Sequence, residues 1–213
     1  MSRVVRVGDD PAAAADEAAR TIRAGGVVVY PTETLYGIGA DACDAAAVRK
    51  VAAAKRRPEG KPILVVVGSP DGVVPLVTHI PAAAREFMLA FWPGPLTIVF
   101  AAAPGLPAEL TAGTGTVGVR VPSGTFCPPF LAACGVAVTS TSANLAGQPP
   151  PRTLEAIRAA LGPGVDLFVD AGTLPLSLPS TVVSVAGPVP RVLREGAIPV
   201  DRLRAVIPSI TIG

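Results

Sequence analysis

Short apolar runs alternate along this chain with longer segments in which apolar residues recur at helical spacing. The longer runs, at 27–30, 63–67, 96–100 and 116–121, predict strands buried on both faces. Shorter strands are predicted at 136–139, 167–169, 181–185 and 191–193. Helices are predicted at 11–23, 45–55, 81–92, 127–134, 153–161 and 200–206. This order predicts an α/β fold built on a twisted, open, mixed sheet with helices on both faces.

Local signals place the ends of several elements. Asp44 and Thr153 precede two of the predicted helices and can cap them. Residues 31–39 follow the first long strand and are rich in hydroxyls and glycine, which is typical of a polar turn. No internal repeat or clear linker interrupts the pattern, so we expect a single domain over residues 1–213.

Composition excludes several classes of protein. Half of the 213 residues are hydrophobic, enough for a sizeable core, and the net charge is only +2, so a nonspecific nucleic-acid coat is not expected. Three scattered cysteines and one histidine give no metal-binding spacing and indicate reduced thiols in a cytoplasmic protein. We expect neither a signal peptide nor a membrane span.

The lysines mark one short segment. All three lysines, Lys50, Lys55 and Lys61, lie in or just before the sequence Lys-Arg-Arg-Pro-Glu-Gly-Lys-Pro at 55–62, where Glu59 is the only acid. Lys55 continues the apolar stripe of the predicted helix, and Pro58 forces Arg57 into an extended conformation. The cluster is either a polyanion site or a set of cations that complements the helix dipole.

Two polar segments follow predicted strands, where ligands collect in α/β sheets. Thr32 and Thr34 lie after the first strand and would point the same way in an extended segment. Residues 140–144, Ser-Thr-Ser-Ala-Asn, leave the strand at 136–139 and can bind a phosphate or a ribose. The alternative for both segments is a turn whose side chains bond to its own backbone.

Two arginines stand at strands. Arg120 lies in an otherwise apolar strand and needs an anionic partner, either a ligand or a distant acid such as Glu33 or Asp170. Arg194 ends a later strand, where an exposed strand end is the simpler interpretation.

Together these segments resemble the YrdC-like family of threonylcarbamoyl-AMP synthases, which act in the t6A modification of tRNA. The resemblance covers about the whole chain and is carried by the segments 29–37, 91–97, 119–122 and 193–198, the Lys55-x-Arg57 pair, and Ser142-x-Asn144. It implies a YrdC-like fold with a concave basic cavity, and the chain ends too early for the extra C-terminal domain of longer members.

The resemblance also implies the chemistry. L-Threonine, bicarbonate and ATP would give threonylcarbamoyl-AMP and pyrophosphate, usually with Mg²⁺, and the product would pass to tRNA and the t6A transferase proteins. Lys55 and Arg57 would be catalytic. The residues implied to contact ATP are Arg57, Lys61, Thr116, Ser142, Asn144, Pro150 and Arg194. Those implied to hold threonine are Thr34, Arg120, Ser140 and Ser180.

The chain departs from the family pattern at three places. Val66 stands where some members have a histidine. Pro149-Pro150 replaces a serine, so that only the Pro150 carbonyl could contact the nucleotide. Residues 177–180, just before the strand at 181–185, replace a segment that is richer in glycine and acidic residues in other members. Two other functions are less consistent with the chain. An RNA-binding module is disfavoured by the few aromatic residues and low net charge, and a carbamoyl-adenylate-forming enzyme by the lack of room for a partner domain.

Overall fold

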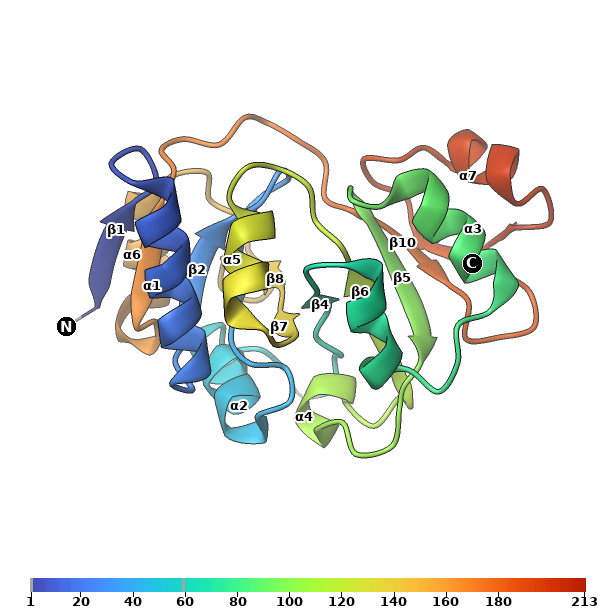
Figure 1. Ribbon diagram of the computed structural model, residues 1–213, viewed down its shortest axis with the longest axis horizontal. Helices are drawn as coiled ribbons and strands as arrows, with labels where there is room; N and C mark the ends of the chain where they lie inside the picture. The colour runs from blue at the N-terminus through green and yellow to red at the C-terminus, as the bar shows by residue number, and fades with distance from the viewer. Residues whose placement is uncertain (1, 59) are drawn as a thin grey trace.

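The strands of the computed structural model, which describes residues 2–58 and 60–213, form two mixed sheets that lie side by side (Figure 1). In the five-stranded sheet the order is β1 (Arg3–Arg6), β9 (Leu167–Asp170), β2 (Val28–Pro31), β3 (Tyr36–Gly39) and β8 (Thr141–Ser142). In the seven-stranded sheet the order is β12 (Thr211–Ile212), β11 (Arg191–Arg194), β10 (Thr181–Ser184), β5 (Leu96–Ala101), β6 (Thr116–Arg120), β4 (Val65–Val66) and β7 (Val138–Thr139).

The helices predicted from the sequence begin and end close to the expected residues, whereas the short helix at Ala108–Thr111 was not predicted. The helices are α1 (Pro11–Arg23), α2 (Ala45–Ala54), α3 (Ala82–Phe91), α4 (Ala108–Thr111), α5 (Cys127–Cys134), α6 (Leu154–Leu161) and α7 (Val200–Val206), with 3₁₀ turns at Pro70–Leu76 and Gly162–Gly164. Both predicted caps are confirmed. Asp44 accepts from Ala46 N at 2.8 Å, and the Thr153 hydroxyl accepts from Ala156 N at 3.3 Å.

Helices cover both faces of the five-stranded sheet. Because successive side chains of a strand point to opposite faces, Val28 and Tyr30 of β2 pack with α1 and α5, whereas Val29 packs with α2 and α6. Figure 1 shows α1 and α5 in front of this sheet and α6 behind it. Its apolar strands are therefore buried on both sides, as their continuous hydrophobic runs predict.

The seven-stranded sheet buries one face in the largest core cluster. Leu96, Ile98 and Phe100 of β5 point into this core with Phe87 of α3. By the same alternation, Thr97 points to the opposite face, which Gly118 and Arg120 of β6 share. This second face of the seven-stranded sheet therefore carries polar side chains, those of Thr97 and Arg120, unlike a sheet face that is covered by helices.

Three expectations about the strands are corrected. The strands form two sheets instead of one open sheet, and residues 36–39 form strand β3 instead of the end of a polar turn. Glycines hid this strand because they break its apolar pattern. Glycine is required at Gly39, because a Cβ there would lie 2.2 Å from Thr139 O. Strand 63–67 is also shorter than predicted, since only Val65–Val66 pairs with neighbours.

The two sheets meet at β3 and β7. Thr139 N donates to Ala40 O at 2.8 Å, and Ala40 N donates to the Thr139 hydroxyl at 2.9 Å. Ser140 follows at once, and its N–H donates to Leu64 O at 2.6 Å. The chain passes here from one sheet to the other, which the sequence alone did not indicate.

Candidate active site

A cavity of about 600 Å³ lies where segments of both sheets come together. It brings together eight of the residues predicted for the site, which are Thr34, Arg57, Arg120, Ser140, Ser142, Pro150, Ser180 and Arg194. They come from segments as far apart in the chain as the β2–β3 loop and the end of β11. The charged side chains that line it in the described part of the chain are three arginines, Arg57, Arg120 and Arg194.

Arg120 is held in this cavity by protein oxygens. Its Nε donates to Gly94 O at 3.0 Å, its Nη1 lies 3.4 Å from the Thr34 hydroxyl, and its Nη2 forms an ion pair with Glu33. The distant acid considered from the sequence is therefore present. The side chain is buried at 7% exposure, and the pair with Glu33 compensates its charge.

Arg194 faces the same space from β11. Its Nη2 donates to Ser180 O at 2.7 Å and approaches the Ser180 hydroxyl at 3.4 Å. Burial, followed by the positive charge of Arg120, lowers the pKa of Arg194. Arg194 is exposed at the end of β11, as the simpler interpretation expected, and it also lines the cavity.

Thr34 is presented by a loop that the Thr32 hydroxyl organises. Thr32 Oγ1 accepts from Leu35 N at 3.1 Å and from Thr34 N at 3.2 Å, and it lies 3.0 Å from Thr34 Oγ1. The two threonines therefore point the same way, as expected. The loop leaves the Thr34 hydroxyl between Thr32 and Arg120, at the cavity wall.

Lys55 reaches the cavity only through a loop. It is 2% exposed, and its Nζ donates to Ser142 O and to Asn144 O, the latter at 2.7 Å. Burial, followed by the charge of Arg57, lowers its pKa to about 8. The Asn144 amide in turn donates to Leu145 O at 2.8 Å and Gln148 O at 2.6 Å. Both side chains fix residues 142–148, and neither lines the cavity.

The rest of the cation segment lies at the cavity's edge. Arg57 lines the cavity and donates to Pro62 O at 2.7 Å, and burial lowers its pKa. Lys61 is exposed and is not part of the lining. Glu59, the acid of this segment, lies outside the described residues.

Thr116 lies on the cavity face of β6 but beyond the lining. It is four positions before Arg120, so both point to the same face roughly 13 Å apart. Gly118 lies between them, and a Cβ there would be 2.4 Å from Leu64 Cδ2 and 3.4 Å from Thr97 Cγ2. The Leu64 side chain therefore covers Gly118, in the space that the missing side chain leaves between Arg120 and Thr116.

Comparison with known proteins now decides the family. The Sua5/YciO/YrdC family model, described as "Telomere recombination", matches residues 20–196. The chain belongs to this family. A Sua5/YciO/YrdC relative from Mycobacterium tuberculosis is 42% identical over 87% of this chain and 85% of its own length. A Bacillus subtilis relative named threonylcarbamoyl-AMP synthase is 35% identical over 91% of this chain, which spans 56% of that protein.

A solved structure of the Sua5/YciO/YrdC family has the same fold. It is Pyrococcus abyssi Sua5 complexed with L-threonine, with 31% identity and a TM-score of 0.92. The similarity covers 100% of this chain and 62% of that one. The mixed α/β, YrdC-like fold predicted from the sequence is thereby confirmed.

The sequence interpretation missed several residues of the lining. Thr97 Oγ1 lies 2.9 Å from Ser180 Oγ, both are buried, and both line the cavity. Ser177 also lines it, and its hydroxyl donates to Thr34 O. Thr97 could have been found, because it is the one polar residue in the apolar run 96–100. Ser177 carries no such signal, since it lies in a segment without regular structure.

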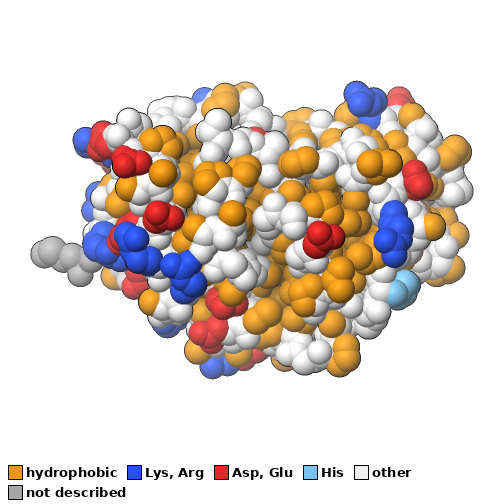
Figure 2. Space-filling view, in the orientation of Figure 1, with side chains coloured by type: hydrophobic (Ala, Val, Ile, Leu, Met, Phe, Trp, Pro, Cys, Tyr) orange, Lys and Arg blue, Asp and Glu red, His pale blue; other side chains and the backbone are white. Residues whose placement is uncertain are grey.

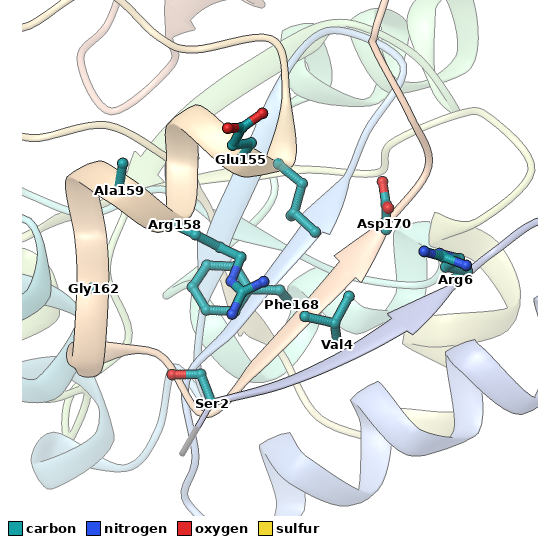
Figure 3. A pocket seen from close by; sticks show the side chains of 10 residues that line it. Ser2, Val4, Arg6, Glu155, Arg158, Ala159, Gly162, Phe168 and Asp170 are labelled. Carbon is teal, nitrogen blue, oxygen red and sulfur yellow. The ribbon is translucent and has the colours of Figure 1, made fainter.

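A second hollow, of about 640 Å³, lies at the far edge of the five-stranded sheet (Figure 3). Arg158 covers Phe168 there, with 5.7 Å between the guanidinium carbon and the ring centre. Arg6, Glu155 and Asp170 lie around it, so cations and acids are mixed. None of the predicted site residues lines this hollow, and it lacks the converging arginines of the first cavity.

Charge on the surface is equally mixed. On the face shown in Figure 2, basic side chains gather toward the N-terminal end of the molecule, with acidic ones among them.

Within residues 2–58 and 60–213, no cluster of His, Cys, Asp and Glu could hold a metal ion. The helices described there are also too short or too polar to cross a bilayer.

Proposed function

We propose that the cavity holds L-threonine and ATP side by side and makes threonylcarbamoyl-AMP, the product in the name of its curated relatives. The observation that carries this proposal is the convergence of Arg57, Arg120 and Arg194 with hydroxyl groups from both sheets. Two anionic reactants repel each other, and fixed guanidinium groups offset that repulsion without reorganising. The L-threonine complexed with Pyrococcus abyssi Sua5 supports the choice of amino acid.

The reaction needs positioning more than proton transfer. The threonine amine forms an N–C bond to the carbon of CO₂ supplied by bicarbonate and becomes a carbamate, while the hydroxide that bicarbonate loses and the amine proton leave as water. A carbamate oxygen then attacks the α-phosphorus of ATP, the bond to the β-phosphate oxygen breaks, and pyrophosphate leaves with the electron pair. Arg120 binds the threonine carboxylate, with Thr34, Ser140 and Ser180 around the amino acid. Arg57, Arg194 and Ser142 bind ATP, and the Pro150 carbonyl contacts the nucleotide.

The remaining predicted residues have less direct roles in this proposal. Lys55 and Asn144 act by holding the 142–148 loop, because their polar atoms contact that loop. Thr116 and Lys61, which lie outside the lining, meet the outer part of the nucleotide. Val66 borders the threonine side in place of a histidine.

A protein-bound Mg²⁺ ion does not fit the described lining, because that lining includes no carboxylate. The Mg²⁺ implied by the family resemblance therefore accompanies the ATP phosphates, and no step is assigned to it. We further place the enzyme in the cytoplasm, where its adenylate passes to the t6A transferase proteins and tRNA.

The decisive experiment measures pyrophosphate release by the purified protein with ATP, threonine and bicarbonate, leaving out each in turn. Release should require all three, and mass analysis of the adenylate formed from a mixture of amino acids should give the threonylcarbamoyl form. ATP turnover that ignores threonine would reject the proposal. Salt-sensitive tRNA binding without turnover would instead favour the RNA-binding module, and use of carbamoyl phosphate would favour a carbamoyl-adenylate enzyme.

A further inference from the structure

Glu33 lies behind the arginine that faces the cavity. Its neighbours Thr32 and Thr34 line the cavity, whereas Glu33 does not. Glu33 Oε1 accepts from Arg120 Nη2 and from Ser123 N, the latter at 3.2 Å. The carboxylate is thus tied to the turn after β6 and holds Arg120 from the side away from the ligand space.

The hydrogen bonds of Arg120 show which donors remain for a ligand. A guanidinium has five N–H groups. One on Nε goes to Gly94 O, one on Nη2 to Glu33, and one on Nη1 approaches Thr34 Oγ1 at a long 3.4 Å. One N–H remains on each terminal nitrogen. These two can hold a carboxylate side by side, as paired guanidinium donors commonly do.

Charge gives Glu33 a second effect on this site. Arg120 is buried, and its charge contributes to the lowered pKa of Arg194, so the two guanidinium groups interact unfavourably. No acid lines the cavity among the described residues to offset this repulsion. Glu33 supplies the compensating charge from outside the lining, which keeps Arg120 in place without occupying the space for the substrate.

Glu33 makes these contacts with a single oxygen. Its other oxygen, Oε2, is buried without a hydrogen-bond partner in the described structure. The contact between Glu33 and Arg120 therefore depends on a single acceptor atom, Oε1. A glutamine could reproduce that acceptor but not its charge, which separates the two contributions.

We propose that Glu33 is a positioning residue that orients Arg120 so that its two remaining N–H groups meet the threonine carboxylate. This inference rests on the proposed function. The competing role is a placeholder, in which Glu33 occupies Arg120 until threonine displaces it. The two roles predict opposite changes in threonine affinity when Glu33 is removed.

The test compares E33A, E33Q and the wild-type protein. Threonine binding is measured by calorimetry, and the KM values for threonine and ATP by pyrophosphate release. E33A should bind threonine about 10- to 100-fold more weakly, the size expected for a lost bond to a charged group, with the KM for ATP unchanged. E33Q should bind threonine more tightly than E33A and more weakly than wild type, because its neutral acceptor bonds Arg120 less strongly.

E109Q is the matched control. Glu109 also pairs with an arginine, Arg49, but on the exposed surface away from the cavity. It should leave threonine affinity unchanged. If E33A does not fold, E33Q alone decides, because its affinity must lie below that of wild type.

Four results would overturn the inference. Tighter threonine binding by E33A or E33Q than by wild type would favour the placeholder role. Equal losses in both KM values, together with a lower Tm, would show a merely structural role. If the wild-type protein binds no threonine, the proposed function fails and this inference fails with it. Wild-type binding that the variants leave unchanged rejects the inference alone.

Discussion

At the scale of single residues, Lys55 is a buried cation. Its pKa of about 8 in the folded chain lies below the ordinary 10.5, first because of burial. Between these values the unfolded chain binds more protons than the folded one, so this group makes stability rise with pH. The Tm of wild type relative to K55M, which lacks the titrating group, should therefore increase from about pH 8 upward. A difference that stays flat or falls would contradict this origin.

The same lysine should control the order of the neighbouring loop. K55M leaves the carbonyls of Ser142 and Asn144 without their buried donor, at a cost of about 1–3 kcal/mol. Hydrogen exchange of the amides in 143–148 should be faster in K55M than in wild type. Unchanged exchange there would show that the loop is held by its own bonds, such as those of the Asn144 amide.

Residue types predicted the site better than residue partners did. Arg120 was recognised because a lone cation in an apolar strand requires an anion, and Glu33 was one of the acids considered, but the choice of Glu33 depends on the fold of its loop. Lys55 was recognised from its clustering, but its contacts with residues 142–144 join segments almost ninety positions apart. The assigned roles of the site residues stay predictions until pyrophosphate release and threonine binding are measured.

At the scale of elements, the N-terminus of α2 depends on Asp44. Its carboxylate accepts from Ala46 N at 2.8 Å and Ala47 N at 3.2 Å. D44A should destabilise the protein by about 1 kcal/mol, and D44S should restore most of it because serine also caps helices. Denaturant unfolding measures both. The KM for threonine should not change, since the cap lies at the opposite end of α2 from Lys55.

The junction of the two sheets makes a second prediction about elements. A Cβ on Gly39 would meet Thr139 O at 2.2 Å and Val138 Cγ1 at 2.8 Å. G39A should therefore force β3 and β7 apart and destabilise the protein by about 1–3 kcal/mol. G187A is the matched control, because nothing lies within 4 Å of its Cβ position. Equal unfolding free energies for the two variants would show that the junction is adaptable.

Helices were easier to predict than strands for a physical reason. The signals for α1, α5 and α6 are local, namely caps, proline, glycine and apolar spacing. Strands such as β8 and β12 have two residues each and exist only because a distant partner lies beside them. The division into two sheets also depends on such pairings, so no local pattern could reveal it.

At the scale of the whole molecule, residues 171–180 connect β9 of one sheet with β10 of the other. Figure 1 shows this connection crossing from the five-stranded to the seven-stranded sheet. Leu176 and Leu178 are 85% and 62% exposed along it, while Ser177 bonds to Thr34 O at the cavity. The segment is thus both open to solvent and attached to the candidate site.

Limited chymotrypsin digestion should cut this connection after Leu176. Exposed irregular segments are preferred sites of nicking, and the prolines after Leu174 and Leu178 block cleavage at those leucines. S177A should be cut faster because it loses the bond to Thr34 O, and threonine with ATP should protect the wild-type protein. The fragments are identified by mass. A first cut elsewhere, or protection by neither ligand, would contradict this view.

The interleaving of the two sheets along the chain has a consequence for synthesis on the ribosome. The walls of the cavity begin at Thr32 and are completed only by Arg194. A growing polypeptide therefore has no complete pocket until the segment through Arg194 has left the exit tunnel. Partly made chains cannot use threonine or ATP to stabilise their fold, so early folding depends entirely on contacts within the protein.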